Sequence, residues 1–281
     1  MIRIHETRTL PPMRRIVVTR RLSLALLAGM LGGCVKPPPP PITAKLPLPS
    51  LRVHDAEEIT QEGMTISVTP ITTVNVRRYP QLHKLITVEV PQRDAAGNVT
   101  STTAQVTTTI VPMPAFQVRI ANNTGHVVRF TGTVFRLQDN TGRTFQTFGT
   151  TAELHAWHAG TLARDLKDPA VQAQVMQQAA PAFTGLQLLN RNVELLKGDE
   201  WVGYLVFNLE TDTKESYSAF FNAIERLSVR IAEVPVQTND AGQVSKVAEF
   251  TFIVDKTSEE VDAQCPGDTV TPSWQLCTRV Q

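Results

Sequence analysis

The chain has 281 residues, with 27 basic and 26 acidic side chains, a formal net charge of +1 and 42% hydrophobic residues. This length and apolar content are sufficient for one large or two small domains with a buried core. The near-neutral charge excludes a strongly basic chain of the kind that binds nucleic acid through its phosphates.

Residues 1–33 have the parts of an export signal, which are a basic beginning, a short apolar core and small residues before the cut. The apolar run Leu22–Leu31 follows a pair of arginines and precedes two glycines. A membrane-spanning helix requires about 20 apolar residues and this run has about ten, so a short transmembrane helix is the less favoured alternative. Translation from Met13 rather than Met1 would retain the same signal.

The end of this segment, Leu31-Gly32-Gly33-Cys34, resembles the lipobox of bacterial lipoproteins. The resemblance implies cleavage before Cys34, lipidation of that cysteine, which palmitate labelling would detect, and a mature chain held to the membrane by lipid. Val35 after the cysteine implies sorting to the outer membrane, with the folded part facing the periplasm. Loss of the first 33 residues removes six arginines and one glutamate, which leaves a net charge of about −4.

Residues 34–50 are expected to form a lipidated, proline-rich tether. Prolines 37–41 are consecutive, and Pro47 and Pro49 follow. This composition favours polyproline II and disfavours helices and central strands, so the segment could hold the fold up to about 50 Å from the lipid. A docking peptide for a proline-recognising partner is the alternative.

The other two cysteines, Cys265 and Cys277, form an even pair in an exported chain, which predicts a disulfide. We expect it to staple a C-terminal tail, residues 257–281. A redox-active or metal-binding pair is the rival interpretation, but the spacing is not Cys-x-x-Cys and no histidine is nearby in sequence.

Residues 51–114 are expected to form a β-hairpin and edge region. The segments 85–90 and 106–111 are rich in Thr, Val and Ile and flank a turn cluster at 94–98, which predicts a long hairpin. The many threonines favour exposed strand positions, so this hairpin is a candidate projecting ribbon.

Alternating apolar residues and turn signals predict an antiparallel sandwich over residues 115–256. One expected strand, 127–137, has Val128, Phe130 and Val134 as candidates for its buried face. The other expected strands are 116–120, 143–148, 193–196, 201–209, 227–234 and 247–254. Helices are predicted from Asp168-Pro169 to about Pro181 and over 215–225.

The turn and core pattern resembles the immunoglobulin-like, telokin-like domains of bacterial surface and periplasmic lipoproteins. It is carried by Phe116-x-Val118-x-Ile120-x-Asn122, Asp139-x-x-Gly142-x-x-Phe145 and Leu196-x-Gly198-x-Glu200-x-x-Gly203-x-Leu205-x-Phe207. The resemblance implies a mostly β, immunoglobulin-like sandwich with one or two short helices and no shared catalytic residues. The segment 150–190 departs from the pattern as a helical insertion.

Glu153, His155 and His158 are close in sequence inside this insertion, and imidazole and carboxylate groups suit zinc or copper. They are the candidate metal ligands, although His-x-x-His is common by chance. The sequence has no Gly-x-Ser-x-Gly, no glycine-rich phosphate loop and no His-Glu-x-x-His.

The sequence therefore predicts a non-enzymatic envelope lipoprotein that needs no cofactor. Its expected partners are the membrane, through the lipid, and another envelope protein, contacted through exposed strand edges. The alternative is a periplasmic ligand- or metal-binding lipoprotein that uses the 150–190 insertion.

Overall fold

The computed structural model describes residues 5–6, 39–93, 99–109, 114–165, 169, 172–173, 177, 185–209, 214–239, 241–267 and 278–279. The chain divides into two compact units, one of residues 1–5 and 47–260 and one of residues 6–46 and 261–281. No membrane-crossing candidate occurs among the helices of the described residues, since none is both long and apolar enough.

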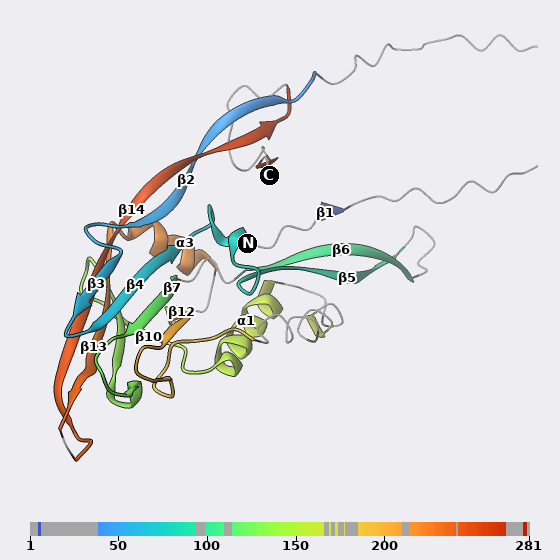
Figure 1. Ribbon diagram of the computed structural model, residues 1–281. Coiled ribbons are helices and arrows are strands. Elements are labelled where there is room, and N and C mark those ends of the chain that lie inside the picture. The colour runs from blue at the N-terminus through green and yellow to red at the C-terminus, as the bar shows by residue number, and fades with distance from the viewer. Residues whose placement is uncertain are drawn as a thin grey trace, which may run out of the picture. The chain divides into compact units, whose positions relative to one another are not determined.

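The described chain is mostly strand (Figure 1). The strands are β1 (His5–Glu6), β2 (Ile42–Val53), β3 (Glu58–Gln61), β4 (Met64–Ile71), β5 (His83–Arg93), β6 (Val99–Thr109), β7 (Ala115–Asn122), β8 (Val128–Arg129), β9 (Val134–Asp139), β10 (Thr144–Thr147), β11 (Glu194–Leu195), β12 (Glu200–Asn208), β13 (Arg226–Thr238), β14 (Val244–Cys265) and β15 (Thr278–Arg279). The helices are α1 (Thr151–Asp165) and α3 (Lys214–Ala223), with 3-10 turns η1 (Val76–Arg78) and η2 (Phe130–Gly132).

The main sheet is antiparallel and has the strand order β15-β14-β13-β9-β10-β12-β7-β4-β3, with β2 also pairing with β14. The sheet is curled, and the end of β4 approaches β2, where Thr72 Oγ1 lies 3.5 Å from Ser50 Oγ. The expected β-rich fold is therefore present.

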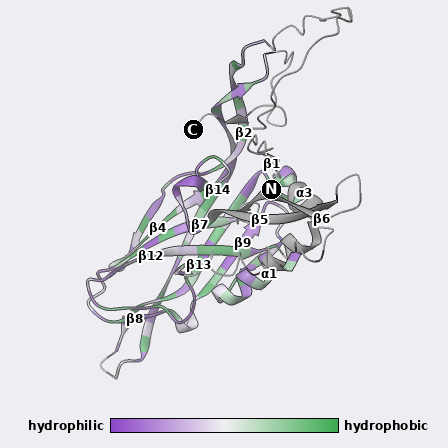
Figure 2. Ribbon diagram, turned by 90° about the vertical axis from the view of Figure 1, so that its right-hand side faces the viewer, coloured by the Kyte–Doolittle hydropathy of each residue, from purple (hydrophilic) through white to green (hydrophobic). Residues whose placement is uncertain are grey.

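One core lies inside the curled sheet. Hydrophobic and hydrophilic residues alternate along its strands, as Figure 2 shows for β9, β12 and β13. This alternation places every second side chain on the buried face. The core includes Met64, Ile66 and Val68 of β4, Phe116, Val118 and Ile120 of β7, Leu227, Val229 and Ile231 of β13, and Phe250, Phe252 and Val254 of β14.

The predicted hairpin is confirmed as β5 and β6, which pair in register from His83 opposite Thr109 to Arg93 opposite Val99. Its turn, 94–98, lies outside the described residues. The hairpin belongs to a sheet of order β1-β6-β5 and pairs with no described strand of the main sheet. The other strands of residues 51–114, β3 and β4, lie at the edge of the main sheet, where β4 pairs with β7 along its whole length.

The tether prediction is wrong for Ile42–Ser50, which belong to β2. Proline is tolerated on a strand when its nitrogen faces away from the hydrogen-bond ladder. Pro47 and Pro49 are two residues apart and therefore point to the same side, and the carbonyl of Pro49 accepts a bond from the Thr73 hydroxyl at 3.5 Å. Both prolines thus sit on the outer edge of β2, where they also oppose pairing by another strand.

The first part of the C-terminal tail, residues 257–265, continues β14. Val261, Ala263 and Cys265 are buried at alternate positions there, as expected for a strand with one covered face.

The strand expected over 127–137 is interrupted. It forms β8, the 3-10 turn η2 and β9, because the chain turns at Phe130–Gly132. The turn shifts the alternation by one residue. Val128 and Phe130 are fully buried as predicted, but Val134 is only half-buried and Phe135 and Leu137 enter the core instead.

Both predicted helical patches agree with the described residues. The second corresponds to α3, with Phe220 and Ile224 buried. Of the first, only Pro169, Gln172, Ala173 and Gln177 are described, and all four are helical.

Candidate functional site

The beginning of α1 is closed by a capping box. Thr150 Oγ1 accepts a hydrogen bond from the backbone N–H of Glu153 at 3.1 Å, and Glu153 Oε2 accepts one from Gly149 N–H at 2.9 Å. The first bond satisfies an N–H group that the helix cannot pair internally, and the second ties the helix to the residue before its cap. The carboxylate of Glu153 is therefore engaged in starting the helix.

The two candidate histidines lie further along α1. His155 is half-buried, whereas His158 is 5% exposed and lies beside Trp157, whose ring packs against Phe148. Burial is the main cause that lowers the pKa of His158, to about 4. His158 is thus a neutral core residue at physiological pH.

The structure does not assemble the metal site that was the alternative interpretation of these residues. Within the described residues, no group of three or more His, Cys, Asp or Glu side chains is placed to hold a metal ion. The helix does bring His155 and His158 to neighbouring positions, but the third candidate, Glu153, caps the helix. A capping-box pattern, Thr-x-x-Glu at 150–153, was the sequence signal that could have shown this.

The cysteines are only partly described. Cys265 is disulfide-bonded. Cys34 and the expected partner, Cys277, lie outside the described residues, so the lipidation and the pairing remain predictions.

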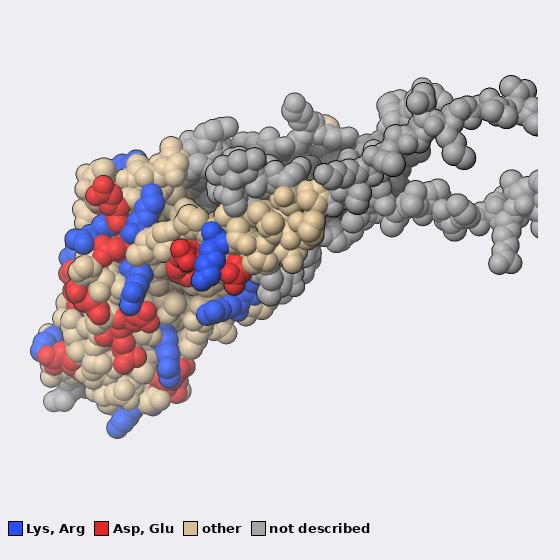
Figure 3. All heavy atoms as spheres, turned by 90° about the horizontal axis from the view of Figure 1, so that it is seen from above, with Lys and Arg blue, Asp and Glu red and all other residues tan. Residues whose placement is uncertain are grey.

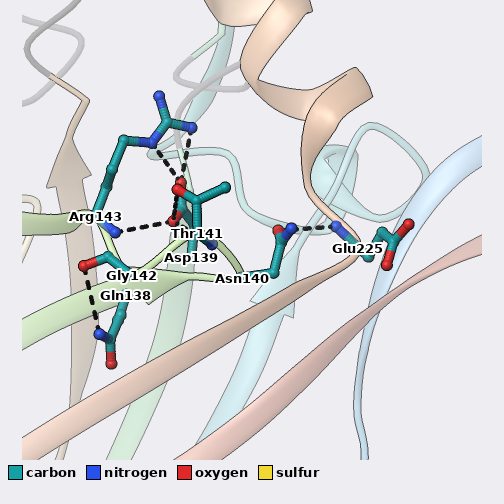
Figure 4. Close-up of polar contacts among 7 residues, drawn as sticks. All are labelled: Gln138, Asp139, Asn140, Thr141, Gly142, Arg143 and Glu225. Atoms are coloured by element: carbon teal, nitrogen blue, oxygen red, sulfur yellow. Dashed lines mark hydrogen bonds and ion pairs between the residues drawn. The ribbon is translucent and has the colours of Figure 1, made fainter.

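Asp139, at the turn between β9 and β10, accepts several hydrogen bonds through its carboxylate (Figure 4). Its Oδ1 accepts bonds from Thr141 N–H at 2.9 Å, Thr141 Oγ1 at 2.7 Å and Arg143 N–H at 3.0 Å. Its Oδ2 accepts Arg143 Nε at 2.7 Å. Burial alone would raise the pKa of Asp139, but the bonds from Thr141 and Arg143 outweigh it and lower the pKa below its ordinary value.

A second turn repeats this arrangement. Asn122 Oδ1 accepts bonds from Thr124 N–H at 3.1 Å and Thr124 Oγ1 at 2.7 Å. The two turns share the sequence Asx-Asn-Thr-Gly, and the glycine has a φ of +88° in each, which L-residues with a Cβ rarely adopt. The resemblance at these positions therefore reflects turn geometry and does not point to a ligand.

The Asp139 turn also holds α3. The Asn140 side chain accepts a bond from Glu225 N–H at 3.2 Å, just beyond the helix (Figure 4). The Arg143 guanidinium carbon lies 5.7 Å from the centre of the Phe220 ring. At the helix end, Lys256 Nζ donates to the backbone oxygens of Phe221 and Asn222 at 2.7 and 3.0 Å. These contacts satisfy the end of the helix and fix it to the sheet.

Charges on the exposed face of the strands are arranged in pairs. Arg119 donates from Nε and Nη2 to Glu200 at 2.6 and 2.7 Å, and similar ion pairs join Arg129 to Glu194 and Arg230 to Glu249. Basic and acidic side chains are interleaved on the face in Figure 3. That face therefore presents no large field of one sign for a charged ligand.

A shallow pocket of about 200 Å³ lies on the outer face of β3, β4 and β7. It is lined by Glu58, Thr65, Ser67, Arg119 and Ala121. Since Arg119 is already paired with Glu200, the pocket does not define the chemistry of a ligand. The long edges of the β5–β6 hairpin are the better candidate for a binding site.

No protein-family model matches the chain, and no curated protein or solved structure matches it.

Proposed function

We propose that this chain is an outer-membrane lipoprotein, anchored through Cys34, whose folded part faces the periplasm and binds an envelope protein without catalysing a reaction. The lipobox-like end of the apolar segment and the residue after Cys34 support the anchor and its address. The sequence patterns of common catalytic sites are missing, which supports a binding role.

The β5–β6 hairpin is the observation that carries the binding role. It is paired along its whole length, yet it joins no described strand of the main sheet. Its backbone is therefore not required to enclose the core. Strand edges of this kind bind extended segments of other proteins through main-chain hydrogen bonds.

The fold within this proposal is an immunoglobulin-like sandwich. The curled antiparallel sheet around a single core and the two Asx-Asn-Thr-Gly turns support it. The metal-binding alternative has less support, because Glu153 caps α1.

Crosslinking in intact cells tests the proposal. A tagged wild-type protein is crosslinked, purified from the membrane fraction and compared with a variant in which 83–109 is replaced by a short Gly-Ser linker. We expect a reproducible envelope protein with the wild type and its loss with the linker variant.

The matched control replaces the turn 239–243, which joins β13 to β14 at a place remote in sequence from the hairpin. This variant should keep the partner. Equal capture by the linker variant, or capture of no envelope protein by the wild type, would contradict the proposal. Far-ultraviolet circular dichroism and thermal unfolding establish that both variants are folded.

A further inference from the structure

The edges of the described strands are protected to very different degrees. Edge strands usually carry charges, prolines or bulges, or are very short, because open edges pair with other chains. β3 has four residues, and β2 carries Pro47 and Pro49. β5 carries Pro91 and charged residues. β6, with the sequence VTSTTAQVTTT, has no proline, glycine or charged residue in its length of 11 residues.

The proline in β5 shows which backbone groups of β6 face outward. Pro91 lies opposite Ser101 and has no N–H, so the ladder loses no bond only if this is a non-hydrogen-bonded pair. The N–H and C=O of Ser101 then point away from β5. Because these directions alternate along a strand, the odd-numbered residues of β6 all present their backbone groups to the outer edge.

The strand beside β6 is absent from the mature chain if the proposed function is right. In the order β1-β6-β5, β1 precedes Cys34 and would be removed with the signal. In the part of the chain that the structure describes, no other strand then pairs with the outer edge of β6.

We propose that a second copy of this chain covers that edge, through antiparallel pairing of β6 with β6 about a two-fold axis at Ala104. The inference rests on the proposed removal of the signal. In this register Val99 of one copy meets Thr109 of the other, and every outward-facing residue meets another outward-facing residue. No charge opposes a like charge, and no proline interrupts the ladder. The hairpins of two copies thus form one four-stranded sheet.

β5 is less suited than β6 to pairing with the same strand of a second copy. An antiparallel pairing of β5 with itself over its full length would place Pro91 opposite Leu85, which loses a bond at an outward-facing position. Lipid anchoring would further favour pairing, because two anchored copies share one membrane and a raised local concentration.

Cysteine crosslinking tests the register. Residues on the two-fold axis face their own copies, and a non-hydrogen-bonded pair has Cα atoms about 4.5 Å apart, within the range of a disulfide. Ala104→Cys in the mature, lipidated protein should therefore form a disulfide-linked dimer on mild oxidation. Residue 102 lies opposite Val106 of the other copy, so the single variant Thr102→Cys should not form a crosslinked dimer. The double variant Thr102→Cys/Val106→Cys should form one.

Proline substitution gives a second, independent measurement. Thr103→Pro removes an outward-facing N–H and leaves the β5–β6 ladder intact, so we expect a monomer by sedimentation in detergent. Thr103→Val keeps the N–H and should remain a dimer. A folded Ala104→Cys protein that stays monomeric on oxidation would overturn the inference, and so would equal crosslinking by Thr102→Cys alone.

The failure of this inference and that of the proposed function are distinguishable. A monomeric protein that still captures an envelope protein through the hairpin refutes the β6–β6 dimer and leaves the proposed function standing. Loss of that capture together with the dimer in Thr103→Pro supports the dimer as the binding form.

Discussion

Asp139 and Arg143 form a bidentate ion pair across the β9–β10 turn, in which Nε and Nη2 of the arginine each lie 2.7 Å from Oδ2 of the aspartate. The aspartate side chain is fully buried, whereas the arginine side chain is 56% exposed. The same guanidinium lies over the ring of Phe220, so one arginine connects the turn to α3.

Asp139→Ala should lower the free energy of unfolding by about 2–3 kcal/mol, because it removes the acceptor for several hydrogen bonds at a buried position. Asp139→Asn keeps one acceptor oxygen and should cost less. Urea unfolding at neutral pH measures both. Equal stability of the alanine variant and the wild type would show that the turn holds without this side chain.

The buried His158 should make stability depend on pH. Its pKa is about 4 in the folded chain, against an ordinary value of 6.5, so the unfolded state binds the proton more readily. The contribution is complete above pH 6.5 and is lost as the pH falls towards 4, by up to about 3 kcal/mol. Unfolding experiments across this range should show the fall. His158→Gln should flatten that part of the profile, and an unchanged profile would contradict the assignment to His158.

Gly203→Ala should destabilise the protein by about 2–3 kcal/mol. An added Cβ would meet the ring of Trp201 and would lie 2.5 Å from the backbone oxygen of Gln187. Thermal unfolding measures the loss. Adding Trp201→Ala relieves only the ring contact, so we expect the double variant to remain less stable than Trp201→Ala alone. If the double variant were as stable as Trp201→Ala alone, the contact between the added Cβ and the Gln187 oxygen would relax without a loss of stability.

Cys34→Ser should abolish lipidation and release the chain from the membrane fraction. Metabolic labelling with palmitate, followed by fractionation, measures both effects. Cys277→Ser is the matched control and should still be labelled. Palmitate incorporation into Cys34→Ser would defeat the lipobox interpretation.

Cys265 is disulfide-bonded, and we predict that Cys277 is its partner. In that case neither thiol of the exported native protein should react with maleimide before reduction. Cys277→Ser should free Cys265 and lower stability by about 3 kcal/mol or less, because the closed loop is short. Reactivity of Cys277 in the native wild type would exclude the pairing.

Local signals in the sequence were sufficient for the elements that depend on neighbouring residues. The helical spacing of Phe220 and Ile224 predicted α3, and the turn cluster at 94–98 with its flanking apolar runs predicted the β5–β6 hairpin. Helix spacing and turn residues are short-range properties, so they can be read without knowing the rest of the fold.

The proline-rich start of β2 could not be recognised in this way. Its composition favours an extended, unpaired chain, and only β14 provides the ladder that it joins. The one-residue shift in the alternation of buried side chains after Phe130 was missed for a similar reason. There the 3-10 turn depends on a contact between Phe130 N–H and the oxygen of Val193, which are far apart in sequence.

The candidate metal site also separates what the residue types suggested from what the folded structure decides. The residue types at Glu153, His155 and His158 suited a metal, but the helix start uses the carboxylate and the core buries the second imidazole. Residue type states which chemistry is possible, while burial and hydrogen bonding decide which group is available for it.

By itself, the sequence determined the β-rich character of the chain, the Asx-Asn-Thr-Gly turns and the hairpin, because each depends on residues close together along the chain, and the export signal with its lipobox-like end is a prediction of the same local kind. Only the tertiary structure decided that Ile42–Ser50 join β14 as part of β2, that the chain turns at η2 so that the buried face of β9 shifts, and that β4 pairs with β7. These features require hydrogen-bond partners from distant segments, and the choice among such partners is made when the core forms.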